Sequence, residues 1–125
     1  MDKLKEVELT ALIPLVNRAC ETIKLNPRIK DEKAVEIVKQ LKVDMTKYDK
    51  LVTHECVIAR TIMFDEKVKE LNKGFSNAMA INIGCGLDNR FTRADNVTVK
   101  WHDVDLAEMI SLKKTSIKIM REERC

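Results

Sequence analysis

The residues best suited to chemistry lie in the segment 82–88, which reads Asn-Ile-Gly-Cys-Gly-Leu-Asp, and at Asp105 downstream of it. Glycines at the end of a strand let the backbone turn sharply and approach a ligand closely. In open parallel sheets, ligands bind beyond the carboxyl ends of the strands. An acidic residue that closes the next strand, about 20 residues on, can accept hydrogen bonds from two ribose hydroxyls. Gly84, Cys85, Gly86 and Asp105 therefore predict a site for a nucleoside-containing cofactor, although two glycines alone would equally suit an ordinary turn.

The segment lacks one feature of the dinucleotide fingerprint. That fingerprint has a third glycine, which lets a helix pack closely with its N-terminus facing a pyrophosphate, and Asn89 stands at that position. The negative charge of Asp88 also opposes a diphosphate at this turn. A cofactor without phosphate is favoured, and a nicotinamide-nucleotide domain is disfavoured.

The elements that must position these residues are helices in the first two thirds of the chain and strands and a helix in the last third. Apolar residues at three- and four-residue steps predict helices over 4–25, 31–41 and 53–72, and Pro14 predicts a break or kink of the first helix near Ile13. Asp31 and Thr53 are the expected N-caps, and Lys73-Gly74 is the expected stop of the third helix. Apolar or β-branched runs predict strands over 78–83 and 97–101, and a last helix follows over 106–120.

The pattern predicts an α/β fold, in which N-terminal helices (1–75) precede an incomplete β-α-β-α unit (76–125). Strand 78–83 is a continuous apolar run ended by glycine, so we expect it to be buried on both faces. The third helix carries Arg60 next to its expected buried face, which is formed by Val57, Ile58, Thr61, Phe64, Val68 and Leu71. The last helix offers Met109, Ile110, Leu112, Lys113, Ile117 and Met120 for packing.

Composition indicates a single globular domain. The chain has 125 residues, 45% hydrophobic and 34% charged, with a net charge of +3. Lys and Glu are interleaved without a basic block, so no nucleic-acid partner is expected. No apolar run approaches the roughly 20 residues that cross a bilayer, and the first residues do not form a signal peptide. The four cysteines show no C-x-x-C spacing, so we expect reduced thiols in a cytoplasmic protein and no metal site.

Four segments resemble the leucine carboxyl methyltransferase family, which includes bacterial enzymes similar to the tetracenomycin polyketide O-methyltransferase. Residues 81–91 (INIGCGLDNRF) are similar to the family's "NLGCGLDTRF" segment. Residues 101–110 (WHDVDLAEMI) look like its "WYDLDLPEVI", and residues 60–65 (RTIMFD) look like its "RTRIFD". Residues 26–35 (NPRIKDEKAV) are similar to its "NPIIKDPKA". The segments occur in family order and span nearly the whole chain.

The resemblance implies a Rossmann-like class I methyltransferase fold, S-adenosylmethionine as cofactor, and methyl transfer to an oxygen of a carboxylate or another small-molecule acceptor. By position, Gly84, Cys85 and Gly86 would approach the cofactor and Asp105 would hold its ribose hydroxyls. Arg60 would pair with the methionine carboxylate, as a planar guanidinium does well; a surface ion pair is the alternative for this residue. Asp88 and Asp103 are supporting candidates, which are nearly as well explained as solvated loop acids. Ile62 and Ala107 depart from the family, which has arginine and proline there.

No catalytic base is identified. A sulfonium methyl is already activated, so the protein mainly has to align an oxygen nucleophile with it. His54 and His102 could titrate near neutrality, but both are more simply explained as packed or solvated residues.

Family members are about twice this long and have a seven-stranded sheet. We therefore interpret the chain as the N-terminal portion of such an enzyme, either a cut piece or a truncated gene product, with weak or absent cofactor affinity. Two strands leave open edges, so we expect a homo-oligomer in which a second copy covers them. The alternative function is a non-catalytic, oligomerising remnant that acts as an interaction module.

Overall fold

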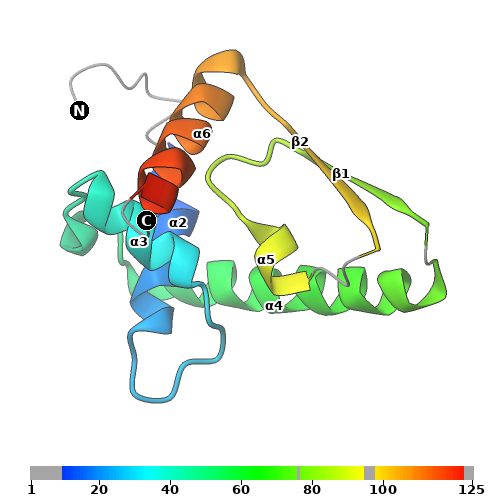
Figure 1. Ribbon diagram of the computed structural model, residues 1–125. Coiled ribbons are helices and arrows are strands. Elements are labelled where there is room, and N and C mark those ends of the chain that lie inside the picture. Colours follow the sequence, from blue (N-terminus) through cyan, green and yellow to red (C-terminus); the bar gives the residue numbers. More distant parts are fainter. Residues whose placement is uncertain (1–9, 76, 95–97, 123–125) are drawn as a thin grey trace.

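The computed structural model describes residues 10–75, 77–94 and 98–122. The helical part consists of α2 (Leu12–Thr22), α3 (Glu32–Gln40), the 3₁₀ turn η1 (Met45–Lys47) and the long helix α4 (Leu51–Gly74). The remainder follows in the order β1 (Met79–Ile83), α5 (Arg90–Ala94), β2 (Lys100–Val104) and α6 (Ala107–Glu122). This is the expected succession of helices and a β-α-β-α unit (Figure 1).

Helix α2 is the central element of the helical part, packed against both α3 and α4. It begins at Leu12, so Pro14 lies in its first turn, where a missing amide hydrogen costs no helical hydrogen bond. The expected helical residues 4–9 lie outside the described part of the chain. Asp31 caps α3 as predicted, since its carboxylate accepts a hydrogen bond from the Ala34 amide at 3.0 Å.

The hydrophobic core lies where α2 and α3 meet the rest of the molecule. Leu12, Leu15 and Ile37 are fully buried there. Leu87 from the loop after β1 and Met109 from α6 join the same cluster, so the core reaches the loop that carries the glycines.

Helix α4 starts two residues earlier than the sequence predicted. The His54 amide donates to the Lys50 carbonyl at 2.7 Å, so the helix is already formed at Leu51 and the N-cap position falls on Lys50. Thr53 is therefore inside the first turn, and its prediction as the N-cap was wrong. The helix ends at Gly74, as expected.

The buried side of α4 changes character along its length. Val57, Ile58 and Thr61 are buried as predicted, but Phe64 and Leu71 are 53% and 50% exposed. The inward positions farther along are instead the polar residues Asp65 and Asn72, because they face the polar groups of α5. The side-chain Nδ2 of Asn72 donates to the Ala94 carbonyl at 3.1 Å, and Asp65 binds two arginines of α5, Arg90 and Arg93.

The two strands form a parallel sheet in which Met79 pairs with Lys100 and Ile83 with Val104. Strand β2 thus lies three residues later than the predicted 97–101, because the backbone of β1 sets the pairing. The Lys100 amide donates to the Ala78 carbonyl at 3.1 Å, and the Gly84 amide donates to the Val104 carbonyl at 2.7 Å.

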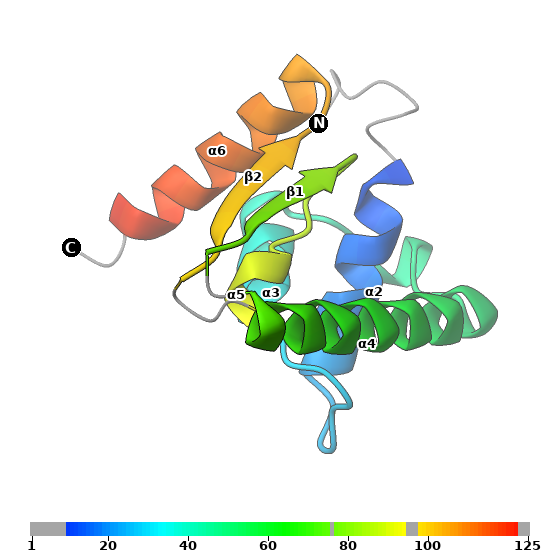
Figure 2. The same ribbon diagram turned by 90° about the vertical axis from the view of Figure 1, so that its right-hand side faces the viewer.

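The sheet is covered on one face, which contradicts the prediction that β1 is buried on both. Ala80 and Asn82 are half-buried on the face where Asn82 contacts Asp103, which pairs with Lys113 of α6. Helix α6 runs along the sheet (Figure 2). On the other face Met79, Ile81 and Ile83 are 60%, 57% and 80% exposed, so the described residues leave this face largely uncovered. The apolar run ended by glycine therefore predicted a strand correctly, but it did not predict how much of that strand is buried.

Two further observations concern the chain as a whole. None of the helices in the described residues combines the length and apolar character needed to cross a membrane. Cys20, Cys56 and Cys85 are free thiols, while Cys125 lies outside the described residues.

Candidate functional site

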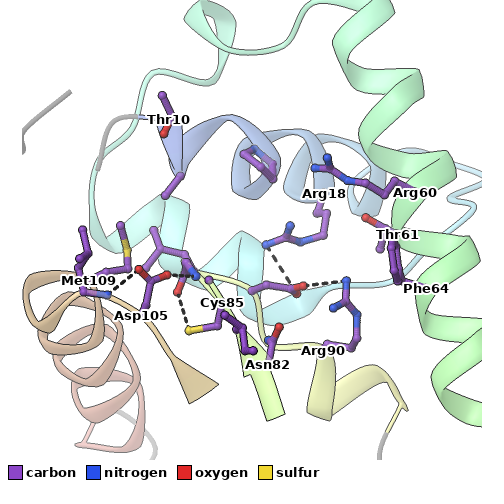
Figure 3. Close-up of a pocket in the computed structure, with 18 residues that line it drawn as sticks. Thr10, Arg18, Arg60, Thr61, Phe64, Asn82, Cys85, Arg90, Asp105 and Met109 are labelled. Atoms are coloured by element: carbon purple, nitrogen blue, oxygen red, sulfur yellow. Dashed lines mark hydrogen bonds and ion pairs between the residues drawn. The ribbon is translucent and has the colours of Figure 1, made fainter. Parts of the chain in front are cut away.

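A cavity of about 560 Å³ lies where the carboxyl end of β1 meets α2, the middle of α4 and the start of α6 (Figure 3). Its volume is in the range of small-molecule sites, roughly 300–1,000 Å³. Six of the seven residues predicted to bind a cofactor line it: Arg60, Gly84, Cys85, Gly86, Asp88 and Asp105. The seventh, Asp103, does not line it.

The bend after β1 depends on its two glycines. Gly84 has φ +64° and Gly86 has φ +52°, which is the left-handed region that side chains disfavour. A Cβ at Gly84 would meet no atom within 4 Å, and one at Gly86 would meet only the Ala11 side chain, at 3.7 Å. The backbone conformation, rather than crowding, therefore requires glycine at both positions.

Asp105 lies against this bend. Its Oδ2 accepts a hydrogen bond from the Gly86 amide at 2.7 Å, and its Oδ1 accepts one from the Leu106 amide at 2.7 Å. The proximity of the glycine bend and Asp105, which their spacing in the sequence predicted, is therefore present. Asp105 is half-buried, so its carboxylate also faces the cavity.

Asp88 is held by three arginines rather than solvated. Its Oδ1 lies 2.9 Å from Arg93 Nη1 and 3.9 Å from Arg18 Nη2, and its Oδ2 lies 3.3 Å from Arg90 Nη2. Burial opposes ionisation, but the guanidiniums of Arg18, Arg93 and Arg90 outweigh it and hold the pKa of Asp88 below its ordinary value. The alternative interpretation of Asp88, a solvated loop acid, is therefore wrong, and as a supporting candidate Asp88 lines the cavity.

The same arginines bind two further carboxylates and complete a charge-balanced cluster, of which Arg18, Asp88 and Arg90 line the cavity. Arg93 Nη1 lies 2.7 Å from Asp31 Oδ2, and Arg93 Nε lies 2.6 Å from Asp65 Oδ2. Arg18 Nε lies 2.9 Å from Asp31 Oδ2, and Arg90 Nε lies 3.0 Å from Asp65 Oδ1. Burial disfavours the charge on Arg93, yet these carboxylates outweigh it and raise its pKa. The cluster ties α2, the cap of α3, α4 and α5 to the loop after the glycines.

Arg60 is the cavity arginine that has no carboxylate partner in the part of the chain that the structure describes. It extends from α4 toward the cavity, and its side chain is exposed (Figure 3). The alternative, a surface ion pair, is not found among the described residues. Arg90 also lines the cavity, and its guanidinium lies 5.6 Å from the ring centre of Phe64 in a cation–π contact.

Asp103 forms an ion pair with Lys113 of α6, whose charge also acts on the Cys85 thiol. Asp103 Oδ2 lies 2.6 Å from Lys113 Nζ, and Asn82 Nδ2 lies 3.4 Å from Asp103 Oδ1. Cys85 lines the cavity but is otherwise buried, and this burial raises the pKa of its thiol although the Lys113 charge counteracts it. A buried thiol with a raised pKa is a weak nucleophile.

Neither histidine lines the cavity. His54 is buried, with Nε2 2.8 Å from Glu21 Oε2 and Nδ1 2.9 Å from Asp49 Oδ1. His102 is exposed on β2. They are a packed and a solvated residue, the interpretations favoured from the sequence.

The sequence missed most of the arginines and carboxylates of the buried cluster. It identified Asp31 only as a helix cap and gave no role to Arg18, Asp65, Arg90 or Arg93. These charged residues do not disturb the spacing of the apolar residues, so the pattern does not single them out. Their partners lie up to 62 residues away in the sequence, as for Arg93 and Asp31. The usable signal was that Asp65 and Arg90 stand inside two of the four segments that resemble a known family.

Comparison with known proteins gives a consistent result. The model of the leucine carboxyl methyltransferase family matches residues 11–124. The tetracenomycin polyketide synthesis O-methyltransferase TcmP of Streptomyces glaucescens is 27% identical over 113 residues. That alignment covers 89% of this chain and 42% of the relative, so the chain spans about two fifths of the relative's length. With nearly all of its described residues inside the family match, the chain belongs to the leucine carboxyl methyltransferase family.

Proposed function

We propose that the chain forms the cofactor-binding part of an S-adenosylmethionine-dependent O-methyltransferase whose acceptor is a carboxylate or a polyketide hydroxyl. One observation carries the proposal: the glycine bend, the Asp105 carboxylate and Arg60, which has no carboxylate partner among the described residues, line one cavity. The family supplies the reaction class, and the acceptor class follows from the family description and the relative's name.

The residues present fit this cofactor. A carboxylate at the end of β2 suits two ribose hydroxyls, and an unpaired guanidinium suits an amino-acid carboxylate. Asp88 is surrounded by Arg18, Arg90 and Arg93, whose charges the cluster's carboxylates balance, so the loop offers no spare positive charge for a diphosphate. The cavity chemistry therefore favours S-adenosylmethionine over a nicotinamide dinucleotide.

Each residue would have a distinct task. The left-handed bend at Gly84 and Gly86 presents backbone, with no side chain, to the ligand. Asp105 accepts hydrogen bonds from the ribose, and Arg60 binds the methionine carboxylate. The buried cluster keeps the Asp88 loop fixed, so little conformational entropy is lost when ligand binds.

The cofactor supplies an activated sulfonium methyl group when it is bound. The protein then has to orient an oxygen nucleophile and exclude water, tasks for which positioning is worth more than acid–base catalysis. The residues that would choose the acceptor are proposed to lie in the part of the relatives that this chain does not match. We therefore expect the isolated chain to bind cofactor weakly and to be inactive alone.

Calorimetric titration with S-adenosylmethionine tests the proposal. Weak saturable binding, with a Kd of about 1 mM, is expected for the chain. Asp105→Asn and Arg60→Met should each weaken it by about tenfold, the loss of one charge-assisted hydrogen bond. Lys67→Met, on the exposed surface of the same helix as Arg60, is the control and should bind like the parent.

Three results would contradict this assignment. Absence of binding at 10-fold higher ligand than the expected Kd would remove the cofactor site. Binding of NAD at lower concentration than S-adenosylmethionine would favour the dinucleotide alternative. Submicromolar binding of S-adenosylmethionine would show that the site is complete, against the expectation of a partial one.

One observation favours a second function, that of a non-catalytic interaction module. The exposed apolar face of β1, with Met79, Ile81 and Ile83, is a surface of the kind that pairs with other chains. This function predicts self-association without any effect of S-adenosylmethionine, so the same titration separates the two.

A further inference from the structure

Lys113, on α6, has an unusual environment for a lysine. The sequence placed it among residues available for packing, and it is indeed 4% exposed. A buried ammonium group is costly unless its hydrogens are bonded. Lys113 Nζ meets this condition with two oxygens, Asp103 Oδ2 at 2.6 Å and the Asp88 carbonyl at 2.5 Å.

The two partners of Lys113 belong to the two segments that build the cofactor cavity. Asp88 follows the glycine bend, and Asp103 is on β2, two residues before Asp105. The hydrogen bond between the Gly86 amide and Asp105 Oδ2 joins the same two segments on the cavity side. Lys113 therefore connects the two segments without lining the cavity, through a side chain that is 5% exposed.

The loop after the bend is thus held at two different atoms of one residue. The Asp88 side chain is fixed by arginines of α2 and α5, and the Asp88 carbonyl is fixed by Lys113 of α6. Without Lys113, the arginines would still hold the side chain. The Asp88 carbonyl would, however, lose its hydrogen bond to α6, and the bend would be held to the end of β2 only by the Gly84, Cys85 and Gly86 amides.

We propose that Lys113 is a positioning residue that holds the glycine bend against Asp105 and thereby sets the geometry of the nucleoside end of the cavity. Its role in ligand affinity rests on the proposed function, whereas its hold on the bend does not. Because Lys113 does not line the cavity, it acts through Asp88 and Asp103 and touches no ligand.

Hydrogen exchange in the full chain without ligand tests the hold directly. In Lys113→Met, exchange of the Gly86 amide should speed up by about tenfold relative to amides of α2, the effect of losing a charge-assisted bond. Lys113→Arg keeps a charge and should restore most of the protection. Lys114→Met, the exposed neighbour on the same helix, should leave Gly86 unchanged.

A merely structural lysine gives a different pattern. Lys113→Met would then lower protection evenly in all elements, or leave Gly86 as slow as in the parent, and either result overturns the proposal. If Lys113→Met does not fold, Asp103→Asn decides in its place, because it removes one partner at a half-exposed position. Faster exchange at Gly86 in that variant supports the proposal, and unchanged exchange overturns it.

Titration with S-adenosylmethionine separates this inference from the proposed function. Binding about tenfold weaker in Lys113→Met than in Lys114→Met is expected. If the parent chain binds no S-adenosylmethionine, the proposed function fails and the exchange of Gly86 still decides the role of Lys113. If the parent binds and Lys113→Met binds equally well, the claim about affinity is wrong.

Discussion

The helical part and the sheet of this molecule use similar side chains to opposite effect. Ile37 of α3 is fully buried between helices, whereas Ile81 of β1 is 57% exposed. Both are isoleucines in regular secondary structure, so residue type does not distinguish them. The difference is that α2 and α3 cover each other, while one face of the two-stranded sheet has no described cover.

Polar residues also differ between the two regions, because they are buried in the helical part while apolar residues are exposed on the sheet. In the cluster, Arg18, Asp31 and Arg93 are buried and bonded to one another, whereas the opposite face of the sheet exposes apolar side chains. The cavity lies at the boundary between these regions. The ion pairs of the buried cluster hold the cavity wall formed by Arg18, Asp88 and Arg90 in place, whereas the wall formed by Ile83 of β1 is open.

The largest effect is expected from Arg93→Met in the buried cluster. Removal of this guanidinium leaves Asp31, Asp65 and Asp88 short of a partner in a poorly hydrated place. Loss of one partner from a buried ion pair costs about 3–5 kcal/mol of unfolding free energy. Urea unfolding followed by circular dichroism measures it. Arg60→Met, at an exposed arginine, is the control and should change stability by less than about 0.5 kcal/mol; equal losses would contradict the assignment of the cluster as structural.

A matched pair of isoleucines comes next. Ile37→Ala should cost about 2–4 kcal/mol, because the cavity it leaves is enclosed by packed helices. Ile81→Ala should cost less than about 1 kcal/mol, mainly from the lower strand propensity of alanine. Equal unfolding free energies of the two variants would mean that the exposed face of β1 is covered in solution.

The contrast also explains what could be predicted from the sequence. The glycine bend and Asp105 were predicted because parallel strands bring their carboxyl ends to one edge, a rule that needs only the order of elements. The Asp31 cap was predicted because its partner, the Ala34 amide, is three residues away. Interactions that depend on local order or on a topological rule can be derived from the chain.

The predictions that failed concern features set by residues far apart in the sequence. The buried cluster joins residues as far apart in the sequence as Arg18 and Arg93. The spacing of apolar residues does not predict that a carboxylate such as that of Asp65 faces inward. The bounds of β2 follow from the register of β1, and the exposure of β1 follows from missing cover. Lys113 was identified as a packing position but not as a bonded ammonium, because its partners lie in other elements.

Acid should weaken the buried cluster before it affects the apolar core. The pKa of Asp88 is held below its ordinary value of 3.8, so the folded chain binds fewer protons than the unfolded chain at that pH. The stabilisation is therefore complete above about pH 4 and is lost as the pH falls through the folded pKa. In Asp88→Asn, the pH dependence of unfolding free energy below pH 4 should be shallower by at most about 1.4 kcal/mol per pH unit. Glu70→Gln, an exposed carboxylate of α4, should leave the slope unchanged, and a slope equally steep in Asp88→Asn would contradict the prediction.

The smallest effect on stability, and the sharpest on assembly, is expected at the open face of the sheet. Strand β1 carries no charge between Met79 and Ile83, and charges are what commonly protect an exposed edge from pairing. Association of the parent chain through β1 therefore remains a prediction, which light scattering at low micromolar concentration can measure. Ile81→Lys should return the chain to a monomer while changing its unfolding free energy by about 0.5 kcal/mol or less.

Leu25→Lys, which changes an equally apolar but 95% exposed side chain in the loop after α2, should leave association as it is. A parent chain that is already a sharp monomer would show that an uncharged strand edge of this length does not suffice for pairing.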